Sequence, residues 1–227
     1  MIKSVSRHII LLFLALSPGI RGAERLYVFY PTMVRSQVLQ KEFSKTFAGV
    51  DVIVFGKYGD FRAKIAADSS AAVLTRPALI DQLPGYEKRL TGVRDGKTEE
   101  AYRLVSVGKP VKTDSLGSIT IGVLDFLGKQ GMEEFVSSMT RHHAKVKRVM
   151  KLEDLLPLLT FEMAQAILVT DEQIALLKKT SNLDLIVTQL PGAQSGIIAL
   201  GAQKSASPDA VIKALRTQTV LGVQQWK

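Results

Sequence analysis

The sequence contains no cysteine among its 227 residues. Disulfide bonds, cysteine-based metal sites and attachment of a lipid to a cysteine are therefore excluded. Histidines are also scarce: there are three, and two of them, His142 and His143, are adjacent in a basic run. Adjacent side chains do not converge on one point, so we expect no metal site there, and nothing else in the sequence indicates a cofactor.

Phosphate-binding and catalytic motifs are missing too. The stretch GVLDFLGKQGMEEF, residues 122–135, has five residues between Gly122 and Gly128, where a P-loop has four, and Gln130 follows Lys129 where a P-loop has a hydroxyl residue. Ser195, in QSG, lacks the G-x-S-x-G pattern of a nucleophile. We therefore expect no enzyme. The glycines of 122–135 serve either backbone geometry or a turn whose amides face an anion.

One apolar run, Ile9 to Leu16, follows Lys3 and Arg7 near the start of the chain. Its eight residues are far fewer than the roughly 20 that a membrane span requires. The pattern is typical of a secretory signal, and we expect residues 1–22 to be removed by cleavage near Gly22. The sequence thus predicts a periplasmic protein.

The chain has an excess of basic residues, with a formal net charge of +9. The expected signal contains Lys3, Arg7 and Arg21 and no acidic residue, so its removal lowers the charge from +9 to +6. This balance favours anionic ligands or surfaces. Nucleic acid is not expected as a partner, because the basic residues are scattered rather than arranged in a stripe.

Short apolar segments, bounded by turns, alternate with helical patterns along the rest of the chain. Such alternation predicts an α/β fold with largely parallel sheets. The expected strands are Leu26–Tyr30, Val50–Phe55, Ala71–Leu74, Ala101–Val107, Ile119–Leu124, Lys145–Val149, Ala166–Val169, Leu183–Thr188 and Gly196–Ala202.

Two polar stretches interrupt this alternation. The segment Leu83–Thr98 is charged and rich in turn residues, and we expect it to form a surface loop or hairpin. The second, Lys109–Ser118, suggests a boundary between two lobes. We therefore expect residues 23–110 together with 195–227 to form lobe 1, and residues 111–194 to form lobe 2.

Five segments of the mature sequence carry a resemblance to a known family: LYVFYPT, VIVFGKYGDFRAKIA, SSAAVLTRPALI, ITIGVLDFLGKQGMEEF and SPDAVIKALRTQTVLGVQQW. With them the mature sequence resembles the two-lobed periplasmic solute-binding proteins of the type II fold, in particular the phosphate and phosphonate branch of ABC-transporter binding proteins. The resemblance implies two α/β lobes, each with a central mixed and mostly parallel sheet, that close around a ligand.

The resemblance also implies which residues contact the ligand. Thr75 and Arg76 are further supported by their position, because they follow a short strand where open α/β sheets place ligand contacts. Phe126 and Leu127 depart from the family, which usually has small hydroxyl residues there. Either the ligand is partly apolar, or Lys129 supplies the charge, or solute binding has been lost. The implied contacts are Tyr30, Thr32, Arg35, Ser36, Tyr58, Gly59, Thr75, Arg76, Asp125, Gly128 and Lys129.

Two functions are compatible with these features. The leading hypothesis is a monomeric binding protein that captures a small anionic solute and presents it to the permease of an inner-membrane transporter. The alternative is a sensory or interaction module of the same fold that has lost solute binding and binds a protein partner, such as a sensor kinase.

Overall fold

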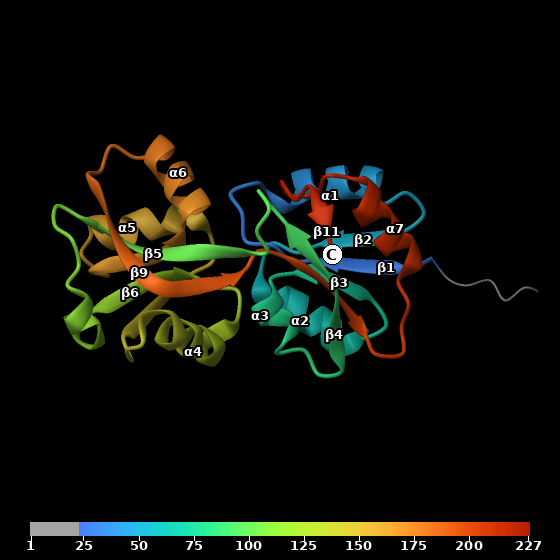
Figure 1. The fold of residues 1–227 in the computed structure, drawn as a ribbon, viewed down its shortest axis with the longest axis horizontal. Helices are drawn as coiled ribbons and strands as arrows, with labels where there is room; N and C mark the ends of the chain where they lie inside the picture. The colour runs from blue at the N-terminus through green and yellow to red at the C-terminus, as the bar shows by residue number, and fades with distance from the viewer. Residues whose placement is uncertain (1–22) are drawn as a thin grey trace, which may run out of the picture.

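The computed structural model describes residues 23–227, which form two α/β lobes side by side (Figure 1). The expected signal, residues 1–22, lies outside the described residues. Lobe 1 contains a six-stranded sheet in the order β11-β4-β10-β3-β1-β2. Its elements are β1 (Arg25–Val28), α1 (Ser36–Thr46), β2 (Asp51–Val54), α2 (Tyr58–Ala67), β3 (Ala72–Thr75), α3 (Pro77–Ile80), β4 (Tyr86–Val93), β10 (Ala199–Gln203), α7 (Asp209–Thr217) and β11 (Gln225–Trp226).

Lobe 2 contains a five-stranded sheet in the order β7-β6-β8-β5-β9. Its elements are β5 (Glu99–Val107), the 3-10 helix η1 (Thr113–Ser118), β6 (Thr120–Leu124), α4 (Gly128–Thr140), β7 (Lys145–Val149), the 3-10 helix η2 (Leu152–Asp154), α5 (Leu155–Thr160), β8 (Ala166–Thr170), α6 (Asp171–Thr180) and β9 (Leu185–Gly196).

Each lobe is built around three parallel strands joined by helices. In lobe 1, β1 pairs in parallel with β2 and β3, and in lobe 2, β6 pairs in parallel with β7 and β8. Every residue of β3 and of β8 is buried, as expected for a central strand that helices cover on both faces. Antiparallel strands complete both sheets: β4, β10 and β11 in lobe 1, and β5 and β9 in lobe 2.

The chain crosses between the lobes twice, from β4 to β5 and from β9 to β10 (Figure 1). The two crossovers are hydrogen-bonded to each other, because the Ile197 N–H donates to the Thr98 carbonyl at 3.0 Å. The expected lobe boundary at residue 110 was therefore wrong. The strand β5 pairs with β8 and β9 of the second sheet, so the first crossover precedes it.

Half of the segment expected to be a loop or hairpin, Leu83–Thr98, is a strand. Residues 86–93 form β4, which pairs with β10 on one side and with β11 at its end on the other. Its charged residues Glu87 and Lys88 are exposed, while Leu90 and Val93 are buried. Charged side chains are common on strands whose edge is partly free. Here they give the segment the composition of a loop, so the strand was not predicted from the sequence.

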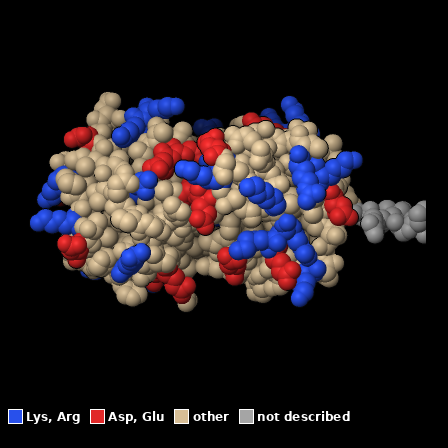
Figure 2. Space-filling model, viewed as in Figure 1, with Lys and Arg blue, Asp and Glu red and all other residues tan. Residues whose placement is uncertain are grey.

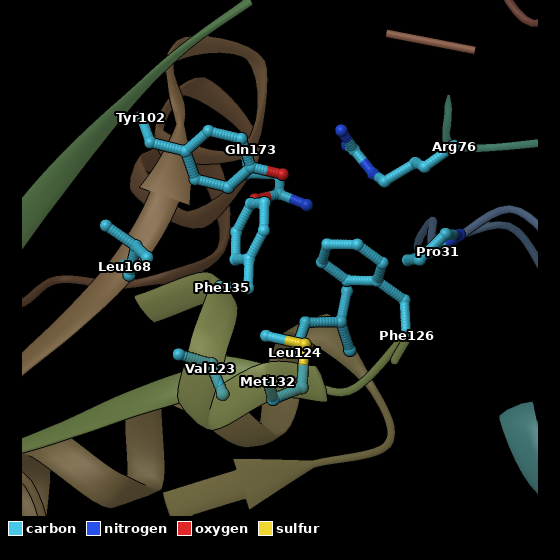
Figure 3. Close-up of a pocket in the computed structure, with 10 residues that line it drawn as sticks. All are labelled: Pro31, Arg76, Tyr102, Val123, Leu124, Phe126, Met132, Phe135, Leu168 and Gln173. Carbon is cyan, nitrogen blue, oxygen red and sulfur yellow. The ribbon is translucent and has the colours of Figure 1, made fainter. Parts of the chain in front are cut away.

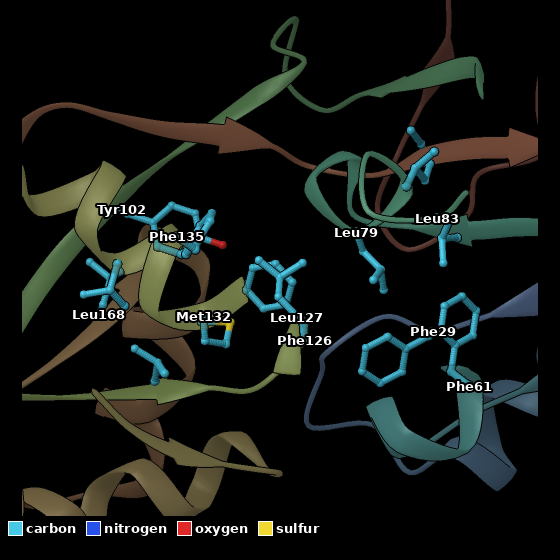
Figure 4. Packing of buried hydrophobic residues seen from close by; sticks show 14 of the residues in the cluster. Phe29, Phe61, Leu79, Leu83, Tyr102, Phe126, Leu127, Met132, Phe135 and Leu168 are labelled. Atoms are coloured by element: carbon cyan, nitrogen blue, oxygen red, sulfur yellow. The ribbon is translucent and has the colours of Figure 1, made fainter. Parts of the chain in front are cut away.

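The buried apolar residues form three clusters. One lies in lobe 1 around α1 and α7, and another lies in lobe 2 around α5 and α6. The third contains residues of both lobes, including Phe29, Phe61 and Leu79 of lobe 1 and Phe126 and Phe135 of lobe 2 (Figure 4). The two lobes therefore share a hydrophobic core, which stabilises the closed arrangement.

A carboxylate at the outer end of lobe 1 contributes to its stability. Asp68 accepts hydrogen bonds from the Ser70 hydroxyl at 2.6 Å, from the Tyr27 hydroxyl at 2.7 Å and from the Arg25 guanidinium at 2.6 Å. The bonds from Ser70, Tyr27 and Arg25 lower the pKa of Asp68 well below its usual range. A group with a lowered folded-state pKa stabilises the fold above its unfolded pKa, and this contribution is lost on acidification.

We expect Asp68→Asn to lower the free energy of unfolding by about 1 kcal/mol at neutral pH. The difference from the wild type should shrink as the pH falls below about 4, the usual pKa of an aspartate, because the wild-type carboxylate then loses its advantage. Urea unfolding of both proteins from neutral to acidic pH tests this. A difference that stays constant over that range contradicts it.

No helix within residues 23–227 has the length and apolar character needed to cross a membrane.

Candidate functional site

Arg76 lies at the centre of the interlobe cleft, between the end of β3 and the start of α3. Its side chain is 2% exposed, and its Nη1 lies 2.6 Å from Oε1 of Glu100, in the second residue of β5. This ion pair joins the two sheets next to the first crossover. The sequence predicts that a ligand supplies the negative charge beside Arg76. In the structure this charge is the carboxylate of Glu100.

Three aromatic rings surround the Arg76 guanidinium, whose central carbon lies 5.4 Å from the ring centre of Tyr30, 5.5 Å from that of Phe126 and 5.8 Å from that of Tyr102. Figure 3 shows the side chain reaching over Phe126 toward Tyr102. Burial alone would lower the pKa of Arg76, but Tyr102, Tyr30 and Glu100 outweigh it and raise the pKa. Arg76 therefore stays charged, held by its carboxylate partner and by cation–π contacts.

The space beside Arg76 is small. A cavity of about 10 Å³ remains there, room for about one water molecule. Most of the residues that line it are apolar, but Arg76, Gln173 and the Tyr102 hydroxyl add polar groups to its wall (Figure 3). Phe126 and Leu127 are both buried, at the edge of the lobe 2 group that faces Leu79 and Phe29 (Figure 4). These two side chains seal the cleft where hydroxyl residues were expected.

The turn before α4 also satisfies its own polar groups. The Gly128 N–H donates to Oδ1 of Asp125 at 2.8 Å, and Arg148 pairs with Oδ2 of the same carboxylate. Asp125 is buried, so this carboxylate takes the place that an anion would occupy at the start of the helix. The turn is thus already neutralised without a ligand.

Two glycines of α4 let the lobes approach closely. Gly128 has φ +75°, and a β-carbon added to it would lie 2.8 Å from Cε1 of Tyr58 in lobe 1. At Gly131 an added β-carbon would lie 2.4 Å from Nε2 of Gln82, also in lobe 1. Gly128 and Gly131 of GVLDFLGKQG therefore serve backbone geometry and close contact between the lobes, whereas a β-carbon added to Gly122 would meet Leu158 within lobe 2.

A larger hollow opens beside this sealed centre. It has a volume of about 480 Å³ and is bordered by both lobes. We call it the interlobe groove. Five of the expected contacts lie in its wall: Tyr30, Thr32, Arg35, Ser36 and Asp125.

The other expected contacts are distributed differently. Thr75 and Arg76 are buried behind the groove, and Tyr58 packs against Gly128 across the cleft. Gly59 and Lys129 are exposed and line neither the small cavity nor the groove. Whether any of these residues contacts a ligand stays a prediction.

Sequence reasoning missed Glu100 and Tyr102. Glu100 is 24 positions from Arg76 in the chain, and the two meet only because β5 crosses beside β3's end. Tyr102 lies between Ala101 and Arg103 near the start of an ordinary strand pattern. Neither residue carries a local signal that distinguishes it from a core or surface position.

Further ion pairs lie at the waist between the lobes. Arg94, just after β4, pairs with Glu172 in α6 and so connects lobe 1 to lobe 2, while Arg103 in β5 lies 3.3 Å from Asp171. Figure 2 shows acidic side chains gathered along this waist, with basic ones among them. The acidic side chains of Asp171 and Glu172, between the lobes, are therefore each paired with an arginine. Among the described residues, no group of three or more His, Cys, Asp or Glu side chains is placed to hold a metal ion.

No protein-family model matches the sequence, and no curated protein matches it either. Solved structures do match. The substrate-binding protein of an amino acid ABC transporter has a TM-score of 0.58 and 16% identity over 84% of this chain and 91% of its own. Arginine-bound ArgBP from T. maritima, in a variant form, has a TM-score of 0.58 and 14% identity over 87% of this chain and 96% of its own.

The periplasmic sensor of the Borrelia burgdorferi hybrid histidine kinase Hk1 is also similar. Its TM-score is 0.53, with 9% identity over 88% of this chain and 94% of its own. The chain has the two-lobed periplasmic binding-protein fold. At these identities the likeness concerns the fold alone, and the fold occurs in both transport and sensor proteins. The phosphate and phosphonate branch stays a prediction.

Proposed function

We propose that this protein is an exported, non-enzymatic module of the binding-protein fold that acts by binding a protein partner, with its interlobe cleft closed by its own side chains. The observation that carries this proposal is the state of Arg76. Its charge is paired with Glu100, and about 10 Å³ of space remains beside it. Small-molecule sites usually have volumes of roughly 300–1,000 Å³.

A solute that used Arg76 would meet two opposing costs. It would have to displace the Glu100 carboxylate, which would then be left without its partner in a buried position. It would also have to separate Phe126 and Leu127 from the apolar residues of lobe 1. The closed arrangement therefore competes with any ligand for the same residues.

The structural neighbours support this proposal as far as fold allows. They include a histidine kinase sensor as well as transport proteins, so closure around a transported solute is only one use of this architecture. We propose the periplasm as the location, because of the expected signal at residues 1–22, and no cofactor is required for partner binding.

Capture of a small anionic solute is the second candidate. The interlobe groove favours it, because Tyr30, Thr32, Arg35 and Ser36 line a hollow of about 480 Å³ next to the turn at Asp125. In that case the protein would present a phosphate-like or other anionic solute to an inner-membrane permease, and the groove would be its binding site.

Thermal unfolding of residues 23–227 separates the two candidates. The panel comprises phosphate, phosphonates, sulfate, carboxylates and amino acids. A solute at about 100 times its dissociation constant would add roughly 2.7 kcal/mol to the stability. We expect no rise in the unfolding midpoint with any of them. A reproducible rise with one solute, abolished in Arg35→Ala but retained in Lys213→Ala on α7, would establish the second candidate instead.

A further inference from the structure

The interlobe groove has an apolar rim as well as polar walls. Val34, after β1 in lobe 1, and Met150, after β7 in lobe 2, are 44% and 45% exposed, and both line the groove. Met33 lies beside Val34 and packs against the buried cluster of lobe 2. The rim is therefore formed jointly by the two lobes and exists in this form only when they are closed.

Basic side chains outnumber acidic ones in the wall of the interlobe groove. Arg35, Lys57 and Lys151 line it, and none of the three forms an ion pair within residues 23–227. Of its two acids, Asp125 is paired with Arg148, which leaves Glu153 as the opposing charge. The groove thus presents an excess of positive charge beside exposed apolar side chains.

We propose that the interlobe groove binds an extended acidic segment of a partner protein, with apolar side chains interspersed between its carboxylates. In an extended chain alternate side chains point to opposite sides, so one set can contact Val34 and Met150 while the other lies near Arg35, Lys57 and Lys151. This inference rests on the proposed function, since it requires the lobes to stay closed. An inorganic anion would leave the apolar rim in water.

The test uses a fluorescein-labelled hexapeptide of alternating Asp and Leu, titrated with residues 23–227 and followed by fluorescence anisotropy. We expect saturable binding that weakens as salt is raised from about 0.05 to about 0.5 M. A peptide of alternating Lys and Leu should not bind, because its charge is reversed. A peptide of alternating Asp and Ser should bind at least about tenfold more weakly, because it lacks the apolar contacts.

Two double variants with the same change of net charge provide the matched comparison. Lys57→Glu with Lys151→Glu should weaken binding of the Asp–Leu peptide by about tenfold or more, since each places an acid in the groove. Lys178→Glu with Lys213→Glu, on α6 and α7 away from the groove, should bind as the wild type does. An equal loss in both double variants would show that net charge alone attracts the peptide, and would overturn the proposal.

Failure of this inference is distinguishable from failure of the proposed function. If no solute raises the unfolding midpoint and the Asp–Leu peptide shows no saturable binding, the groove is not the acidic-segment site, and the closed module keeps another surface for its partner. If a solute does raise the midpoint, the proposed function itself fails. Displacement of the peptide by inorganic phosphate at the concentration that raises the midpoint would identify a small-anion site and overturn the inference.

Discussion

Replacing Arg76 by alanine is expected to lower the free energy of unfolding by about 3–5 kcal/mol, because the substitution leaves Glu100 buried without its partner. The Arg76 side chain is 2% exposed and the Glu100 side chain 12%, so the guanidinium is cut off from water and the carboxylate is largely so. The same substitution also removes the contacts of the guanidinium with Tyr30 and Phe126. Urea unfolding, with the slope checked for two-state behaviour, measures the loss.

A double variant distinguishes the buried charge from the lost contacts. Arg76→Met together with Glu100→Met should be more stable than either Arg76→Ala or Glu100→Ala, because it removes both charges and fills the site with apolar atoms. Arg103→Ala is the matched control: its partner Asp171 is exposed, so the loss should be at most about 1 kcal/mol. If Arg76→Ala lost no more stability than Arg103→Ala, Arg76 would not hold the lobes closed.

This outcome also bears on function. A ligand-binding arginine can be replaced with little loss of stability when the ligand is absent, since solvent hydrates it in the open cleft. An arginine that is part of the fold cannot. A large loss of stability in the absence of any solute would therefore support the closed module, and a small loss would count against it.

Much of the architecture is predictable from the sequence, because the parallel strands are local signals. The segments AAVL and AILV are apolar throughout, and each lies at the centre of its sheet. The strand β4 is not predictable in this way, since its partly free edge allows the charged residues Glu87 and Lys88 in a segment that already contains turn residues. The lobe boundary failed because two polar stretches, Leu83–Thr98 and Lys109–Ser118, both resemble linkers, and the first crossover lies at the end of the earlier one.

The candidate site was predictable only where position in the fold decides it. Arg76 follows a buried strand, and that position alone places it in the cleft. Its partner Glu100 carries no such positional signal, because the pair forms only where the start of β5 passes beside the end of β3, 24 positions away in the chain. Phe126 and Leu127 were recognisable as unsuited to an anion site, but that they seal the cleft follows from their burial against lobe 1.

Phe126→Ala is the second variant with a large expected effect, a loss of about 3–5 kcal/mol in the free energy of unfolding. The ring is buried, packs edge-on against Phe135 at 5.1 Å between ring centres, and lies over the Arg76 guanidinium. Its removal would enlarge the small cavity beside Arg76 and admit water to the ion pair. By contrast, Phe161→Ala should change stability by less than about 0.5 kcal/mol, because that ring is 71% exposed.

A second readout links Phe126 to the closed state rather than to packing alone. If the ring shields the Arg76–Glu100 pair from water, Glu100→Gln should cost less stability in the Phe126→Ala background than in the wild type, and the double-mutant cycle should show coupling of about 0.5 kcal/mol or more. Small-angle scattering of Phe126→Ala should show a larger radius of gyration than the wild type, as the lobes separate. Strict additivity of the two substitutions, with an unchanged radius, would mean that Phe126 merely fills the core of lobe 2 and that other contacts keep the cleft closed.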